Sequence, residues 1–136
     1  MIFRIASGLV KEMHRLAATG APDEVCGLLL GRAGDILALR EARNVAADRK
    51  RRFEIDPAVL LATHREVRGL GMAVIGHYHS HPHGSTVPSA RDAARALENG
   101  QLWLIIACAK IEGWMAVSGH ADAVHGRFIP VVIEAQ

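Results

Sequence analysis

Hydrophobic residues recur along the first part of the chain with two different spacings. In residues 5–20 (IASGLVKEMHRLAATG), apolar side chains return every three or four positions and stop at Gly20, which predicts a helix. Residues 24–32 (EVCGLLLGR) form a short apolar run, typical of a buried strand. Residues 35–43 (DILALREAR) alternate between two faces. We therefore predict a hairpin of two strands after the first helix.

The later part of the chain mixes strand and helix patterns. Residues 52–56 (RFEID) predict a short strand, and Pro57 opens a helix over 57–71 (PAVLLATHREVRGLG). We expect a further helix over 89–100, which Gly100 ends, and strands over 72–79, 101–109, 113–119 and 127–135. This alternation predicts an α/β fold, with one mixed β-sheet flanked by helices in a single domain over residues 1–136.

Composition and charge narrow the classes of function. Half of the 136 residues are hydrophobic, which excludes an intrinsically disordered chain. The net charge of +2 gives no argument for nucleic acid, and no segment approaches the roughly 20 apolar residues of a membrane helix. Cys26 and Cys108 lie in apolar runs and predict buried, reduced thiols, with one disulfide as the alternative. Because the first residues, with Arg4 and Lys11, lack a secretory signal pattern, we expect a cytoplasmic protein without nucleic-acid or membrane partners.

Four of the eight histidines lie within residues 76–92 (GHYHSHPHGSTVPSARD). On a strand, side chains at i and i+2 share a face and lie about 6.6 Å apart, whereas those at i and i+4 lie about 13 Å apart. Two neighbouring members of the set His77, His79 and His81 can therefore converge on one metal ion, but all three cannot. The metal pair is either His77 with His79 or His79 with His81. A cluster of surface histidines before a loop is the alternative.

Ser89 and Asp92 stand at the start of a predicted helix. They have the spacing of a capping box, in which the serine oxygen and the third residue satisfy backbone donors. The preferred third residue is Glu or Gln, and Asp is too short to reach back as easily. A carboxylate near a helix N-terminus ionises readily, and two histidines with one carboxylate leave a fourth position for water on a catalytic zinc ion. Helix capping and metal binding are both open for this pair.

A metal-activated water also needs a carboxylate base that is near the metal. Glu24, Asp35, Glu54 and Asp56 are the acids that lie beside apolar segments. Glu24 stands out because it lies at the mouth of a buried strand, where burial raises the pKa of a carboxyl group. An exposed acid at a strand edge is the alternative.

Glu24 with CGLLLG, HSHP at residues 79–82, Ser89 and Asp92 together resemble the signature of the JAMM, or MPN-plus, metalloproteases. That signature is a distant Glu, then H-x-H-P, six residues, Ser, two residues and Asp. The resemblance implies a compact stand-alone prokaryotic member with the MPN fold, which is cytidine-deaminase-like. It further implies that His79, His81 and Asp92 bind one zinc ion. Glu24 would then be the general base and acid, and Ser89 would help to hold the bound water and the oxyanion.

By the same resemblance, the reaction is hydrolysis of a peptide or isopeptide bond after the C-terminal glycine of a ubiquitin-like protein. The chain has little room for the insertions of ubiquitin-binding relatives, which favours a small sulfur-carrier protein or its conjugate as the partner. We expect its flexible C-terminal tail to add as a strand beside the active site. A non-catalytic interaction module on the MPN fold and a DNA-associated protein of the RadC type are the alternatives.

The remaining features carry less information. The basic segment RKRR (49–52) predicts a solvated loop, or a surface that steers an acidic carrier protein. The resemblance leaves His77 as a neighbour of the metal site. Trp103 and Trp114 are predicted core anchors, and His125 is predicted to face solvent.

Overall fold

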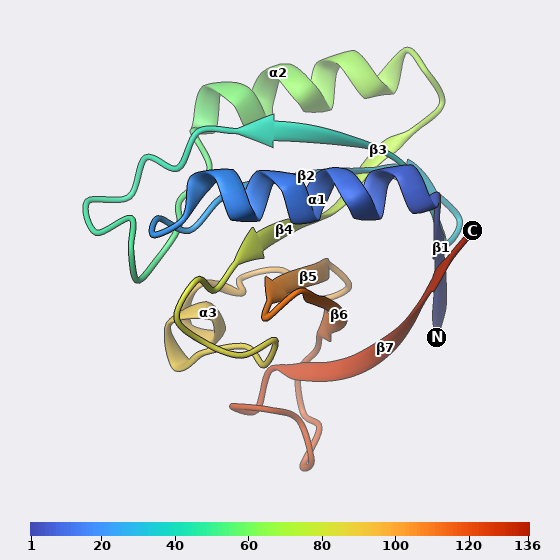
Figure 1. The fold of residues 1–136 in the computed structure, drawn as a ribbon. Coiled ribbons are helices and arrows are strands. Elements are labelled where there is room, and N and C mark those ends of the chain that lie inside the picture. Colours follow the sequence, from blue (N-terminus) through green and yellow to red (C-terminus); the bar gives the residue numbers. More distant parts are fainter.

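Seven β-strands close into a barrel, and three helices pack beside the strands (Figure 1). The structure is a computed structural model and describes residues 1–136. The strands are β1 (Ile2–Ile5), β2 (Cys26–Arg32), β3 (Asp35–Ala42), β4 (Ala73–Ser80), β5 (Leu102–Ala107), β6 (Lys110–Ala116) and β7 (Phe128–Ala135). The helices are α1 (Ser7–Gly20), α2 (Pro57–Arg68) and α3 (Ala90–Arg95). The order of strands around the barrel is β1-β3-β2-β4-β5-β6-β7.

The sheet contains both parallel and antiparallel pairs, which confirms the predicted α/β fold with a mixed sheet and flanking helices. The hairpin of β2 and β3 is antiparallel, as predicted, whereas β4 and β5 run parallel. Side chains of β2 alternate between two hydrophobic clusters. Leu29 packs in the cluster that contains residues of α1, and Leu28 and Leu30 pack with Val67 of α2. The helices α1 and α2 therefore cover opposite faces of β2 (Figure 1).

The prediction of the N-terminal segment was wrong at its start. Ile5 was assigned to the first helix, but it lies in β1, and α1 begins at Ser7. β1 pairs in parallel with both β3 and β7, so it closes the barrel and the first and last strands lie side by side (Figure 1). Its partners lie far away in the sequence, so four residues of local pattern did not indicate a strand.

The predicted helix over 89–100 is also wrong in its length, because α3 ends at Arg95. The carbonyl of Ala96, which a longer helix would pair with the amide of Gly100, accepts instead from the guanidinium of Arg127. The Gly100 amide donates to the Ala116 carbonyl at 2.8 Å. Long-range hydrogen bonds therefore replace the last turn of the helix.

Two further predictions need correction. Residues 52–56 make no strand but only an isolated bridge between Asn44 and Ile55. The Asn44 side chain donates to the Arg52 carbonyl and accepts from the Glu54 amide, so these groups are not available to a neighbouring strand. Cys26 is buried as predicted, but Cys108 is exposed, and both thiols are free. The other predicted strands are confirmed, although β6 lies three residues earlier than the predicted 113–119. The helix that Pro57 opens is confirmed as well and ends at Arg68, three residues before the predicted end, and Asp56 caps it. No helix is long and apolar enough to cross a membrane.

β4 occupies the middle of the sheet between β2 and β5, and one glycine allows this close fit. Gly76 lies opposite Leu102 of β5, and a Cβ at this position would stand 1.9 Å from the Leu102 carbonyl oxygen. A backbone oxygen within a strand cannot move aside without breaking the β4–β5 pairing. The register that positions the residues after Gly76 thus depends on the absence of a side chain there.

We expect Gly76→Ala to lower the free energy of unfolding by at least about 1–3 kcal/mol, the usual cost of forcing atoms into a packed region. Chemical denaturation followed by circular dichroism measures this change. Gly8→Ala is the matched control, since nothing lies within 4 Å of a Cβ there and alanine favours a helix. Equal stability of the two variants would contradict the close β4–β5 fit.

Candidate metal centre

The end of β4 carries the two histidines that the motif singles out. His79 is fully buried within the strand, and His81 follows one residue beyond its end. The His81 amide donates to the Ile106 carbonyl at 2.9 Å, which continues the ladder with β5 past the end of β4. Both side chains therefore project from backbone that the sheet holds, as the i and i+2 spacing predicts.

Three donor atoms meet at the end of this strand. The Nε2 atoms of His79 and His81 are 3.0 Å apart, and the Oδ2 atom of Asp92 lies 3.3 Å and 3.1 Å from them. With metal–ligand distances of about 2.0–2.1 Å, the edge of a tetrahedron around zinc is about 3.3 Å. The triangle formed by the three atoms has nearly these edges, so this donor set fits a tetrahedral ion with one position left for another ligand.

The imidazole of His81 is oriented for this role. Its Nδ1 lies 2.7 Å from the Ser85 carbonyl, which can only accept, so Nδ1 carries the proton. The lone pair of Nε2 then faces His79 and Asp92. A hydrogen bond from the distal nitrogen of a ligating histidine is the usual support for a metal ligand.

Asp92 belongs to both the cap and the donor triangle. The Ser89 hydroxyl oxygen accepts from the Asp92 amide at 3.0 Å, while the Asp92 carboxylate accepts from the Ser89 amide at 2.9 Å. The capping box therefore forms with aspartate, and the expectation that this side chain is too short was wrong. The short side chain reaches back because its Oδ2 sits directly over the first turn, where it also faces the histidines.

Glu24 lies beside the donor triangle without belonging to it. Its carboxylate lies within 4.8 Å of donor atoms of His79 and His81, whereas Asp92 lies within 3.3 Å of both. The side chain is buried, and its Oε1 has no hydrogen-bond partner. Asp92 is thus the better third ligand. Glu24 is placed to act on a molecule that is bound at the fourth position.

Burial and neighbouring charges set the proton affinities of the cluster. Burial raises the pKa of Glu24 to about 7, against the effect of His81. Burial lowers the pKa of His79, although Asp92 opposes the shift. Burial acts to raise the pKa of Asp92, but the neighbouring imidazoles of His79 and His81 hold this pKa below the ordinary value. A neutral His79 and an ionised Asp92 are the forms that bind a metal cation.

The ring of His79 is held by aromatic packing rather than by a hydrogen bond. Its Nδ1 is buried without a partner, and the ring of Phe53 stacks on it at 4.2 Å with 21° between the planes. Trp103 meets the same imidazole edge-on at 5.7 Å. Phe53 was predicted only as part of a strand, so its contact with a metal ligand was missed. An apolar residue beside a basic run gives no local signal of such a contact.

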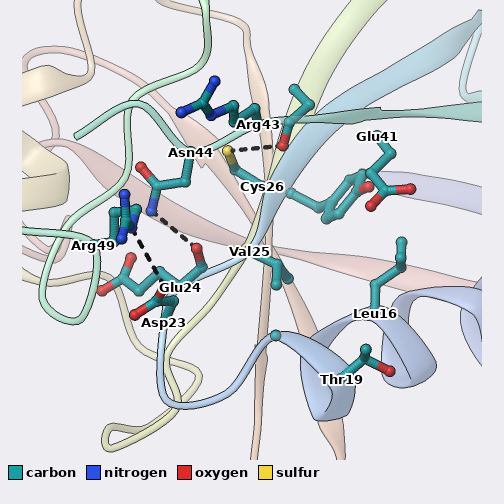
Figure 2. Close-up of a pocket in the computed structure, with 13 residues that line it drawn as sticks. Leu16, Thr19, Asp23, Glu24, Val25, Cys26, Glu41, Arg43, Asn44 and Arg49 are labelled. Atoms are coloured by element: carbon teal, nitrogen blue, oxygen red, sulfur yellow. Dashed lines mark hydrogen bonds and ion pairs between the residues drawn. The ribbon is translucent and has the colours of Figure 1, made fainter.

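Ser80 and Asn44 were also missed. The Val25 amide donates to Ser80 Oγ at 2.8 Å, and the Ser80 amide donates to the Val25 carbonyl at 3.0 Å. Asn44 Nδ2 donates to the carbonyl of Glu24 at 2.9 Å, as Figure 2 shows. These bonds fix the backbone at the Glu24 carbonyl and at the residue that follows it. A cavity of about 320 Å³, to which Glu24, Asn44 and Arg49 contribute, lies beside it.

The other candidate acids lie elsewhere. Asp35 pairs with Arg4 at 2.8 Å, Glu54 lies 3.6 Å from Arg95, and Asp56 caps α2. None of the three belongs to the cluster with His79 and His81.

The remaining singled-out side chains have structural surroundings. His77 packs against Trp103 at 4.2 Å and lies outside the donor triangle, which leaves His79 with His81 as the convergent pair. Trp103 and Trp114 are buried core residues, as predicted. The ring of His125 is exposed, and its Nε2 donates to the Pro88 carbonyl at 3.1 Å.

Known proteins share this arrangement of sequence and fold. Residues 6–129 match the family described as prokaryotic homologs of the JAB domain. A desampylase from Haloferax volcanii is 38% identical over 65% of this chain. A probable TtuB-protein conjugate cleaving protease from Thermus thermophilus is 29% identical over 71% of it. The matched regions span 66% and 64% of these two relatives, just under two thirds of each.

A solved structure agrees with this match. The crystal structure of a JAB1/MPN domain protein from Archaeoglobus fulgidus covers 96% of each chain with a TM-score of 0.61 at 21% identity, a likeness of fold. The family match extends over nearly the whole chain, from α1 into β7. The chain belongs to the prokaryotic JAB-domain family, a branch of the JAMM/MPN proteins that its motif resembles.

Proposed function

We propose that the chain, as one domain over residues 1–136, is a zinc metallopeptidase. Its reaction is hydrolysis of the peptide or isopeptide bond after the C-terminal glycine of a ubiquitin-like protein of the sulfur-carrier kind. The single observation that carries the proposal is the donor triangle of His79, His81 and Asp92 with the partnerless carboxylate of Glu24 beside it. A structural zinc site needs four protein ligands and no base.

The residues divide the chemical work between them. A zinc ion bound by His79, His81 and Asp92 supplies Lewis-acid polarisation and lowers the pKa of water. Glu24 Oε1 accepts the proton of the attacking water and returns it to the departing amine. A carboxyl group with a pKa of about 7 is suited to both steps, because it gains and loses a proton near neutral pH. Water attack and proton return together replace the C–N bond by a carboxylic acid and an amine.

Ser89 has a part that is compatible with its cap. Its oxygen accepts from the Asp92 amide, and its O–H remains available as a donor. Donated to the carbonyl oxygen of the scissile bond, this hydrogen bond strengthens as negative charge develops there.

The substrate class is supported by the relatives. One is described as a desampylase and another as a probable protease that cleaves TtuB–protein conjugates. A ubiquitin-like protein with a narrow, flexible C-terminal tail is the substrate that this reaction and this compact chain favour.

Substitution of a proposed zinc ligand tests the ligand set. We expect His79→Ala to weaken zinc binding by more than about 100-fold, since loss of a supporting residue alone costs about 10- to 100-fold. Zinc content after dialysis and competition with a chromogenic chelator measure this. His83→Ala is the control, because His83 is exposed and outside the donor triangle. Full zinc occupancy in His79→Ala would sink the assignment.

Glu24→Gln separates binding from chemistry. The amide has the same size but cannot take up a proton, so we expect zinc to be retained while kcat falls by about 100- to 10,000-fold. The readout is cleavage of a sulfur-carrier fusion followed by intact-protein mass, alongside zinc content. Turnover at the unmodified rate would exclude Glu24 as the general base.

The pH dependence follows from the same group. Glu24 acts as a base only when ionised, so kcat/KM rises with pH through its pKa. Burial raises that pKa from 4.5 to about 7, and the charge of bound zinc lowers it again, so the midpoint should fall between these values. Initial rates from pH 4 to 9, with zinc content measured at each pH, check this. A flat profile while zinc stays bound would contradict it.

A further inference from the structure

We propose that a basic rim beside the metal centre docks an acidic face of the ubiquitin-like protein whose tail is cleaved, an inference that rests on the proposed function. The basic rim is defined as Arg43, Arg49, Lys50, Arg51 and Arg52, on the loop between β3 and α2. Arg43 and Arg49 line the cavity beside Glu24, and none of the five cations takes part in the cleavage chemistry.

Positive charge is concentrated in this loop. Of the chain's sixteen basic and fourteen acidic residues, residues 43–52 hold five basic residues and one acid, Asp48. The rest of the chain therefore carries two more acids than bases. A net charge near zero for the whole chain conceals a strongly basic segment next to an active site, and local charge rather than net charge steers association.

The side chains of the rim are exposed and poorly neutralised. Arg49 lies 3.4 Å from Asp23 and Arg51 lies 3.8 Å from Asp48, while Arg43, Lys50 and Arg52 make no ion pair. Outside the rim, by contrast, Arg40 binds both carboxylate oxygens of Glu66, at 2.7 Å and 2.8 Å. Most cations of the rim are therefore free to bind a partner.

The backbone under these cations is fixed to the site. The amide of Glu24 donates to the Arg49 carbonyl at 2.7 Å, and the Asn44 side chain joins the carbonyls of Glu24 and Arg52. Figure 2 shows Arg49 and Asn44 side by side with Glu24 at the start of β2. Phe53, directly after the rim, stacks on His79. The rim therefore has a set position relative to both the base and a metal ligand.

The fixed position of the rim beside Glu24 favours a partner whose tail reaches Glu24 while its body contacts the rim. A loop whose backbone is already ordered loses less conformational entropy on binding, so its charges act as a preformed surface. A tail held at Glu24 places the body of its own protein against the adjoining rim. Exposed cations on such a surface raise the rate of association with an acidic face, in a manner that salt screens. A single-stranded nucleic acid is the competing polyanion that the experiment must distinguish.

Binding is tested without cleavage by using zinc-loaded Glu24→Gln protein. Two fluorescein-labelled peptides that end in Gly-Gly are compared, one with a run of glutamates before the tail and one with glutamines. We expect the acidic peptide to bind about tenfold more tightly in about 0.1 M NaCl and to lose the difference in about 1 M NaCl, as the Debye length falls from about 10 Å to about 3 Å. Fluorescence anisotropy gives both dissociation constants.

Adding Lys50→Gln with Arg52→Gln should reduce the preference for the acidic peptide by about threefold to tenfold, as expected for two exposed charges. Arg65→Gln with Arg68→Gln removes the same charge from the exposed side of α2 and should leave the preference intact. Equal effects of the two pairs, or no preference in the unmodified rim, would overturn the proposal. A labelled single-stranded oligonucleotide that binds more tightly than the acidic peptide, and responds to the rim pair alone, would also overturn it.

Cleavage is followed separately in the wild-type protein, with a Gly-Gly aminocoumarin substrate. Cleavage without a preference for the acidic peptide would contradict the docking role of the rim but not the proposed peptidase activity. A salt-sensitive preference without cleavage of any sulfur-carrier fusion would contradict the proposed peptidase activity, while the rim would still be a surface that binds acidic ligands. The two failures are therefore distinct.

Discussion

The pairing of β2 with β4 is the constraint on which the rest of the site depends. In this antiparallel pair Cys26 lies opposite His79, which places the residues just before β2 beside those just after β4. Val25 and Ser80 then exchange two hydrogen bonds, at 2.8 Å and 3.0 Å, one through the serine hydroxyl. Glu24 precedes Val25, so these bonds hold its backbone next to the histidines. A slip of one residue would turn Glu24 or His79 to the opposite face.

The cluster stores unfavourable electrostatics that a cation relieves. Two imidazole nitrogens 3.0 Å apart, an ionised Asp92 and the partnerless Oε1 of Glu24 lie together in buried surroundings. Buried polar atoms without partners cost free energy, and the barrel and its aromatic cluster hold them in place. Phe53 stacks on the ring of His79, and Trp103 packs edge-on against the same ring. The apolar packing that stabilises the barrel thus also orients the imidazole of His79.

The loop between β3 and α2 joins recognition to chemistry. Its inner side supplies Phe53 to His79 and, through Asn44 and the Arg49 carbonyl, two hydrogen bonds to the backbone of Glu24. Its outer side presents the basic rim. Because one short segment does both, a partner that binds the rim as proposed lies at a defined distance from Glu24, the proposed general base. Selectivity for the partner can then change through exposed charges, with the ligands left as they are.

The sequence by itself determined the parts that local patterns encode. The i and i+2 spacing placed His79 and His81 on one face of a strand, and the S-x-x-D spacing placed Asp92 at a helix start. The β2–β3 hairpin followed from alternation and glycine. The local pattern singled out Glu24 among four acids but left an exposed acid as the alternative. Family resemblance favoured Glu24 as the base and selected His81 over His77.

Tertiary structure alone decided the rest, because the deciding contacts join distant segments. β1 is a strand only because β3 and β7 flank it, and α3 stops at Arg95 because Arg127 takes the Ala96 carbonyl. Phe53, Asn44 and Ser80 act through hydrogen bonds and stacking with residues that no periodicity connects to them. Short sequence motifs supply the donor side chains of the metal centre. Their geometry depends on the pairing of β2 with β4 across more than fifty residues, which only the folded barrel brings about.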